Sequence, residues 1–310
     1  MNKIKIIAII ISIFLLAGAT GCQTSTTKNT GTSESYTGTE GLSLRFIDGM
    51  PPQNVWKDTD FEVGVDVQNK GLVGVKDGSV CFGSFSEKVF SKADGCQTLG
   101  ELNGRLDFPE GEIKSYTWDG YKLIQSYKED SNYPISAKVC YKGETRANPI
   151  VCIKSMSYNT KSVCEGGEIN IANANNGQGA PVAVTSVYED IIKKDEGVDL
   201  RFTIKVSNVG GGEIFDADKL KENCNIDRLD KNKIKISAAL TGYEELSCGK
   251  EGIISFGVDG SEGTILCKTT QTILIGEGES YPLPLNIKLN YGYLSSISSE
   301  FTIKKDVEAE

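Results

Sequence analysis

The stretch of sequence that decides the fold is Phe61–Val67, which reads FEVGVDV. Apolar residues stand at every second position, and this period is typical of a strand with one buried face. Leu200–Val206, which reads LRFTIKV, shows the same pattern. Turns are predicted where glycines cluster or stand between such stretches, among them Gly143 and Gly210–Gly212. Helical periodicity is confined to one or two turns at Asp216–Asn223, so the folded part is predicted to be all-β.

Pieces of the sequence recur in the same order in the two halves of the chain. Asp60–Gly71 overlays Asp199–Gly210 at a constant offset of 139 residues, and both end in Val-x-Asn-x-Gly. Repetition in a fixed order predicts a duplicated domain of roughly 115–130 residues. The later matches are Glu110–Glu112 with Glu277–Glu279, and Ala137–Tyr141 with Ile287–Tyr291.

The Val-x-Asn-x-Gly strand, the Gly-Glu turn and a late strand ending in Tyr resemble tandem immunoglobulin-like domains. The resemblance is to the CARDB-type β-sandwiches that are common on archaeal cell surfaces, and it covers residues 42–155 and 180–305. It implies an extracellular, non-catalytic adhesion, binding or spacer role. It transfers no active-site residue, because the matching positions are structural. The Ile- and Lys-rich start of the chain fits an archaeal envelope protein.

The first residues predict export. A positively charged start precedes an apolar run, Ile6–Leu16, which is shorter than the roughly 20 residues that a membrane span needs. Small residues then lead to Cys22, and this ending resembles a prokaryotic lipobox, except that Ala19 stands where Leu is usual. We therefore expect residues 1–22 to be a signal peptide with lipid attached at Cys22. An ordinary cleaved signal peptide and an uncleaved N-terminal anchor are the alternatives.

The remaining organisation follows from composition. Residues 23–40 are mostly Thr and Ser and cannot bury enough apolar surface to fold, so they predict a disordered stalk. Two tandem immunoglobulin-like β-sandwiches are expected after the stalk. The expected ranges are 41–155 for domain 1, 156–179 for a linker, 180–305 for domain 2 and 306–310 for a tail.

Charge and composition exclude several classes of function. The net charge is −9, and an acidic surface repels nucleic acid, so we expect no nucleic-acid partner. The chain contains no histidine. Ser-His and Cys-His nucleophile pairs and His-ligated zinc are therefore impossible. No spacing indicates another catalytic arrangement, and we expect neither enzymatic activity nor a cofactor.

The cysteine count supports an oxidising compartment. Beyond Cys22 there are eight cysteines with no C-x-x-C spacing, which is what four disulfides in an exported chain would give. Eight cysteines allow 105 complete disulfide connectivities, and the spacing favours one of them. The favoured pairs are Cys81–Cys96, Cys140–Cys152 across a hairpin, Cys248–Cys267 and, by elimination, Cys164–Cys224.

Two sets of residues are candidates for ligand binding. Asp58 with Asp60, and Asp216 with Asp218, have the spacing of calcium ligands in loops, although solvated aspartates in turns show it too. Aromatic residues could form a sugar-binding face, although one Trp in the core of each sandwich is the commoner arrangement. The aromatic candidates are Trp56, Trp118, Tyr116, Tyr121, Tyr127 and Tyr133.

The sequence as a whole favours a lipid-anchored protein on the outer face of the cell membrane. Its expected role is non-catalytic adhesion, binding or envelope structure, with a surface protein or glycan as partner. The first alternative is a receptor for a carbohydrate or another solute. The second is a filament subunit joined by strand exchange, with the segment Gly41–Phe46 as the donor strand.

Overall fold

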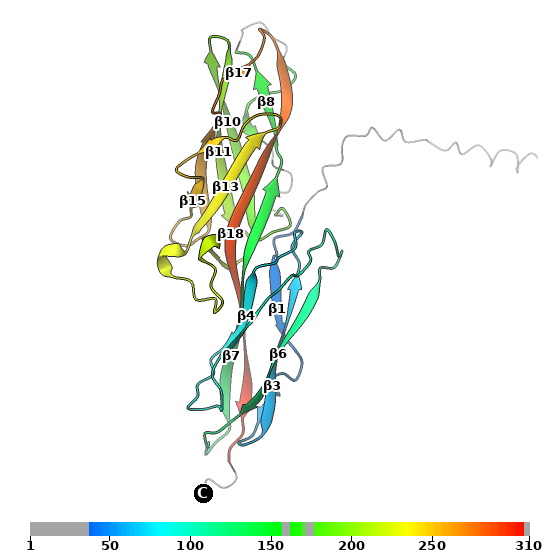
Figure 1. Ribbon diagram of the computed structural model, residues 1–310, viewed down its shortest axis with the longest axis vertical. Coiled ribbons are helices and arrows are strands. Elements are labelled where there is room, and N and C mark those ends of the chain that lie inside the picture. The colour runs from blue at the N-terminus through cyan, green and yellow to red at the C-terminus, as the bar shows by residue number, and fades with distance from the viewer. Residues whose placement is uncertain (1–36, 157–161, 170, 172–176, 307–310) are drawn as a thin grey trace, which may run out of the picture. The chain divides into compact units, whose positions relative to one another are not determined.

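The computed structural model describes residues 37–156, 162–169, 171 and 177–306 (Figure 1). The regular structure within these residues is β-strand apart from two short 3-10 turns, Ala217–Lys219 (η1) and Arg228–Asp230 (η2). The prediction of an all-β fold is confirmed. The carboxylate of Asp216 accepts a hydrogen bond from the backbone N–H of Asp218 and caps η1. None of the described residues belongs to a helix long and apolar enough to cross a membrane.

Three antiparallel strands form the smallest sheet. Their order is β1 (Leu42–Phe46), β3 (Asp60–Asn69) and β6 (Ile113–Lys122). The stretch FEVGVDV lies in β3, at the centre of this sheet. Val63, Val65 and Val67 are fully buried, whereas Glu62 is exposed, as the two-residue period predicts.

The second sheet has six strands from the later part of the chain. The order along its main path is β14 (Ser247–Cys248), β16 (Glu262–Lys268), β11 (Gly197–Asn208), β10 (Val182–Lys194) and β9 (Gly167–Ile169). A short sixth strand, β17 (Ile273–Leu274), pairs with one end of β11. The strand β11 contains the stretch LRFTIKV and lies at the centre of its sheet, as β3 does.

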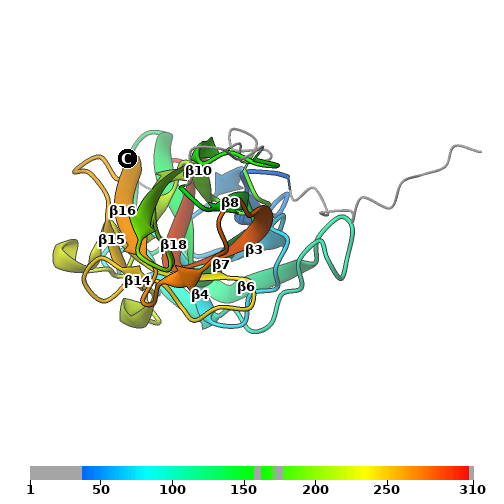
Figure 2. The same cartoon turned by 90° about the horizontal axis from the view of Figure 1, so that it is seen from above.

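The largest sheet has nine strands and takes members from both halves of the sequence. Its main path is β15 (Ile253–Ser255), β13 (Lys233–Leu240), β18 (Ser280–Ile303), β7 (Ser131–Ala147), β4 (Gly78–Gly83) and β5 (Gly95–Thr98). Three shorter strands also pair with β18, namely β2 (Asn54–Val55), β8 (Ile150–Lys154) and β12 (Glu213–Phe215). Figures 1 and 2 both show β18 beside β7.

One ladder at the centre of this sheet joins the two halves of the chain. The pairing of β7 with β18 runs without a shift from Ser131↔Ile303 to Ala147↔Ile287, and it resumes in the same phase at Ile150↔Pro284 with β8. Its central pair is Lys142↔Gly292. The residue Gly143, expected in a turn, is instead within β7, where a Cβ would lie 2.4 Å from the ring of Tyr291.

The strands that flank this ladder divide it into two parts. On one flank β4 pairs with Ser136–Tyr141 of β7, and on the other β13 pairs with Leu285–Asn290 of β18. We call residues 37–141 the N-terminal half and residues 177–291 the C-terminal half. The N-terminal half is completed by residues 293–303, and the C-terminal half by residues 143–154. Strand pairing therefore does not follow the expected domain limits at residues 155 and 180.

Buried side chains pack the two smaller sheets against the large one. Ring centroids of Phe61 in β3 and Phe301 in β18 lie 6.2 Å apart, and those of Trp118 in β6 and Phe82 in β4 lie 5.0 Å apart. Val187, Phe202 and Ile204 of the six-stranded sheet belong to the same hydrophobic cluster as Ile236 and Leu289 of the nine-stranded sheet. Buried aromatic rings contribute large apolar areas and dominate such packing.

The repeated Asn occupies equivalent positions in the two halves. Asn69 Nδ2 donates a hydrogen bond to the carbonyl of Val73 (3.0 Å), and Asn208 Nδ2 donates to the carbonyl of Gly212 (2.7 Å). In each case the acceptor lies four residues further on. Asn69 also pairs with the first residue of β1, and Asn208 with the first residue of β10. The predicted overlay at an offset of 139 residues therefore matches a shared turn geometry.

Several expected segments fall partly beyond the described residues. The predicted signal peptide (1–22), residues 23–36 of the predicted stalk, and residues 307–310 of the predicted tail lie outside them. The last stalk residues are described: the carbonyl of Gly38 accepts hydrogen bonds from the N–H groups of Gly179 and Ala180. The range expected to be a linker contains β9 and one half-cystine, Cys164.

Candidate functional site

All eight cysteines after Cys22 form disulfides. The predicted pairs Cys81–Cys96 and Cys248–Cys267 are present. The predicted pairs Cys140–Cys152 and Cys164–Cys224 are wrong. The observed pairs are Cys140–Cys224 and Cys152–Cys164. Cys22 itself lies outside the described residues.

The error has a geometric reason. Cys140 and Cys152 were expected to face each other across a hairpin, but the chain does not reverse between them. Cys140 pairs with Leu294 and Cys152 with Pro282, so both lie along one side of β18. Twelve residues at about 3.3 Å each separate them by about 40 Å along the strand direction, far beyond the reach of a disulfide.

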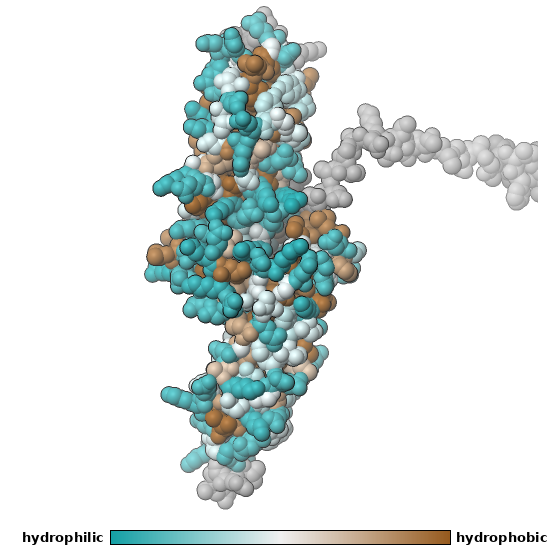
Figure 3. Space-filling view, in the orientation of Figure 1, coloured by the Kyte–Doolittle hydropathy of each residue, from teal (hydrophilic) through white to brown (hydrophobic). Residues whose placement is uncertain are grey.

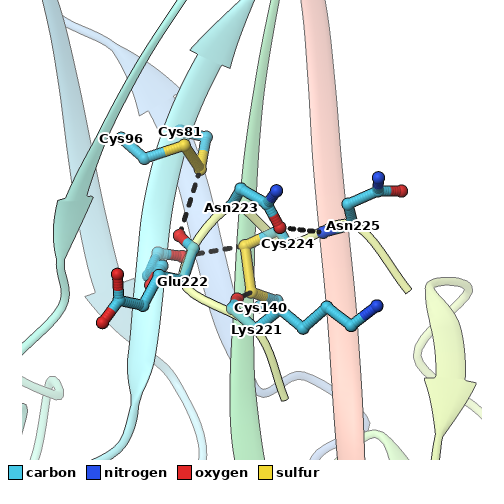
Figure 4. Close-up of a disulfide and its surroundings, with 9 residues drawn as sticks. Cys81, Cys96, Cys140, Lys221, Glu222, Asn223, Cys224 and Asn225 are labelled. Atoms are coloured by element: carbon cyan, nitrogen blue, oxygen red, sulfur yellow. Dashed lines mark hydrogen bonds between the residues drawn. A yellow bond between two sulfur atoms is a disulfide. The ribbon is translucent and has the colours of Figure 1, made fainter. Parts of the chain in front are cut away.

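The Cys140–Cys224 disulfide joins the two halves on one face of the large sheet (Figure 4). Cys140 lies on β7, and Cys224 lies in the segment that follows η1. The Sγ atom of Cys224 is 3.4 Å from the carbonyl oxygen of Ser79 in β4. Cys81, Cys140 and Cys224 are buried and cluster with Phe215. The segment after η1 is therefore fixed to β4 and to the part of β7 around Cys140, both in the N-terminal half.

The acidic candidates for calcium have other partners or stand apart. Asp60 forms an ion pair with Lys122 (3.5 Å), and Asp218 forms one with Lys235. Asp216 caps η1. Asp58 adopts a positive φ of 59°, as turn aspartates do. Within the described ranges, no group of three or more Cys, Asp or Glu side chains is placed to hold a metal ion.

The aromatic candidates do not form a common exposed face. Trp118, Tyr116 and Tyr121 are buried in the core of the N-terminal half, whereas Trp56 is 51% exposed. Burial raises the pKa of the Tyr116 phenol to about 12, and its hydroxyl donates to the carbonyl of Leu99. The remaining two, Tyr127 and Tyr133, are partly buried and pack against the same core.

A buried carboxyl group that the sequence analysis did not single out lies in the C-terminal half. Glu189 of β10 is 2% exposed, and its Oε2 accepts a hydrogen bond from the N–H of Cys152 in β8 (3.1 Å). Its Oε1 has no hydrogen-bond partner among the described residues. Desolvation raises the pKa of this carboxyl to about 7, against the smaller opposing effects of the Cys152 N–H and the charge of Lys154.

The sequence did contain a signal for Glu189. Val187, Glu189 and Ile191 alternate with exposed Tyr188 and Asp190 along β10. In a strand, residues two apart share a face, so Glu189 belongs to the inward-facing set. A carboxyl in phase with apolar residues therefore indicates a buried acid.

A pocket of about 370 Å³ lies between two segments of the C-terminal half. Residues 240–246, which begin at the last residue of β13, form one wall, and residues 269–274, which run from the end of β16 through β17, form the other. The Cys248–Cys267 disulfide joins the chain just beyond these walls. The sequence analysis did not single out this pocket, because its two walls become neighbours through the pairing of β14 with β16 at Ser247↔Lys268, which periodicity does not predict.

Hydrogen bonds fix both walls of this pocket. The hydroxyl groups of Tyr243 and Tyr281 lie 3.0 Å apart. On the other wall, Thr272 Oγ1 donates to Asp199 Oδ1 (2.8 Å), and the N–H of Thr269 donates to the carbonyl of Leu200 (3.0 Å). These contacts tie the rim to β11 and β18 and give the pocket a defined shape.

No family model matches the chain. A search of curated proteins also finds no match.

Proposed function

We propose that this protein is a non-catalytic adhesion, binding or envelope-structural protein, held on the outer face of a cell membrane by lipid on Cys22. In this proposal the Thr/Ser-rich segment is a stalk. The stalk presents two immunoglobulin-like sandwiches of the CARDB type that share the ladder of β7, β8 and β18. The protein has no catalytic activity.

The pairing of eight cysteines into four disulfides carries the proposal. Disulfides persist in oxidising compartments outside the cytoplasm and are rare in reducing ones. This supports the interpretation of residues 1–22 as an export signal. The pairing also uses every later cysteine, so Cys22 is the one cysteine left for lipid.

A second function, a receptor for a carbohydrate or other solute, is favoured by the pocket in the C-terminal half. The strand-exchanging filament subunit has less support. Its proposed donor, Gly41–Phe46, contains β1, which pairs with β3 of the same chain from Leu42↔Asn69 to Phe46↔Val65.

The test is the fate of Cys22 in protein extracted from membranes of an expressing cell. The intact mass, measured after alkylation without reduction, is expected to correspond to a chain that starts at Cys22, carries lipid and has no free thiol. In a Cys22→Ser variant, the intact mass is expected to lack the lipid. The matched control is the double variant Cys22→Ser, Ser25→Cys, which has a thiol nearby but not at the lipidation position.

Two results would contradict the proposal. One is a reduced protein in the cytoplasm, which would remove the argument from the disulfides. The other is wild-type protein from the membrane fraction whose intact mass shows Cys22 without lipid, which would show that Cys22 is not the anchor.

A further inference from the structure

The pocket between residues 240–246 and 269–274 has an apolar floor and a polar rim. Leu240, Leu246 and Ile273 are buried and supply the floor. The exposed rim includes the phenol of Tyr243 and the amide of Gln271. Small-molecule sites usually combine such an apolar surface with a few polar groups that fix orientation.

The charge of the lining selects against anions. Among the described residues that line the pocket, none is Lys or Arg, and Glu244 contributes a carboxylate. A phosphate, sulfate or carboxylate ligand would therefore meet no opposite charge and would be repelled. The chemistry of the lining favours a neutral ligand with hydrogen-bonding groups.

We propose that this pocket binds one neutral sugar residue of a surface glycan. A pyranose has an apolar C–H face, which packs on an aromatic ring, and a perimeter of hydroxyl groups. The ring of Tyr243 is 43% exposed and offers such a surface, and Gln271 and Glu244 offer partners for the hydroxyls. The volume of about 370 Å³ is near the lower end of the usual range for ligand pockets and suits one ring. The proposal rests on the extracellular function, because that is where glycans lie.

The pocket is also held in shape before a ligand arrives. Tyr243 is fixed through its hydroxyl to Tyr281, and Thr272 through its hydroxyl to Asp199. The Cys248–Cys267 disulfide limits how far the two walls can separate. A ligand therefore loses little binding energy to ordering the site.

The test uses the full chain, purified in a detergent without a sugar head group. The probes are the methyl glycosides of glucose, galactose, mannose and N-acetylglucosamine at millimolar concentration. Saturation-transfer NMR detects binding, and calorimetry measures affinity. The variants are Tyr243→Ala, Gln271→Ala and Tyr243→Phe, and near-ultraviolet circular dichroism checks their fold. Tyr188→Ala is the matched control, because Tyr188 is 47% exposed on β10 and does not line the pocket.

At least one glycoside is expected to bind. Tyr243→Ala should weaken it about tenfold, because the ring surface is lost. Gln271→Ala should also weaken it. Tyr243→Phe keeps the ring but loses the hydrogen bond to Tyr281, so it should weaken binding less than Tyr243→Ala does, and Tyr188→Ala should bind within about threefold of the wild type.

Two results would overturn the proposal: no glycoside binds, or the Tyr243→Ala variant binds as well as the wild type. Each of these leaves the membrane location intact. Conversely, sugar binding by a protein found reduced in the cytoplasm would support the pocket and contradict the proposed function.

Discussion

Replacing Glu189 by Gln tests how a buried acid controls the stability of the C-terminal half. The substitution keeps the size of the side chain and an oxygen that accepts the hydrogen bond from Cys152 N–H. It removes the only group at this position that can ionise. Because Glu189 is 2% exposed and its Oε1 lacks a partner among the described residues, its charged form is unfavourable in the folded chain.

The magnitude follows from the pKa shift. Burial raises the pKa of Glu189 from 4.5 to about 7 in the folded chain. Between these values the folded state binds more protons than the unfolded state, so the free energy of unfolding falls as pH rises. The contribution of protonated Glu189 is complete below about pH 4.5 and is lost as pH passes 7. At about 1.4 kcal/mol per unit, the total loss is about 3 kcal/mol.

The assay is urea unfolding at pH 5, 6, 7 and 8, followed by circular dichroism. Between pH 5 and pH 8 the wild type is expected to lose about 2–3 kcal/mol relative to Glu189→Gln, slightly less than the total, because part of the contribution is already lost at pH 5. Glu168→Gln is the control, because Glu168 is exposed on the neighbouring strand β9 and its removal changes the net charge equally. A stability difference between wild type and Glu189→Gln that does not change with pH would refute this reasoning.

Further predictions concern the links between the halves and the turns. Cys140→Ser with Cys224→Ser opens a loop with a sequence separation of 84 residues and should lower the free energy of unfolding by about 4–5 kcal/mol. Cys152→Ser with Cys164→Ser, with a separation of 12, should cost about 3 kcal/mol, and equal losses in urea unfolding would contradict the loop-length argument. Phe301→Ala should destabilise the N-terminal half by about 3–5 kcal/mol, because a buried ring is lost. The fluorescence of Trp118 should then report unfolding at a lower urea concentration. An unchanged midpoint would show that residues 293–303 do not complete this half. Gly111→Ala should lower the thermal stability more than Gly211→Ala. The two glycines have nearly equal positive φ angles, +76° and +77°. A Cβ on Gly111 would lie 1.9 Å from the carbonyl oxygen of Asn69, whereas a Cβ on Gly211 would face open space. Gly211→Ala should cost about 1–2 kcal/mol from the backbone alone, and equal thermal shifts of the two variants would contradict the contact argument.

The sequence predicted local structure well where one face of a strand is buried. The alternation in Phe61–Val67 and Leu200–Val206 identified two central strands, and the shared Asn identified equivalent turns at Asn69 and Asn208. These features depend on neighbours within a few residues. Local patterns report them directly.

The long ladder could not be predicted in the same way. Gly143 and the pair Asn148-Pro149 have turn composition, yet the chain continues in one direction through both and pairs with residues 280–303. This pairing depends on contacts between residues more than a hundred positions apart, for which periodicity carries no information. The wrong disulfide between Cys140 and Cys152 follows from that one missing fact.

The candidate site also combines features that local patterns predict with features that depend on distant contacts. The inward phase of Glu189 is visible in the alternation of β10. The pocket is not visible in the sequence, because Tyr243 and Gln271 become neighbours only through the pairing of β14 with β16. Trp118 illustrates the opposite case: its residue type suits both a core and a ligand surface, and only packing against Phe82 distinguishes them.

Each half of the chain is completed by a segment from the opposite side of the large ladder. This arrangement fixes the order in which the two halves can be completed during synthesis. Synthesis makes residues 37–141 first, but the segment that closes their sheet is residues 293–303, near the end of the chain. Residues 143–154, which complete the C-terminal half, are synthesised before the strands of that half. The half that is made first is therefore finished last. Until residue 303 is available, the edge of β7 that pairs with β18 stays unpaired across Ser131–Tyr141, although β4 already covers part of the other edge, so the sheet of the N-terminal half remains incomplete until the chain is almost fully made.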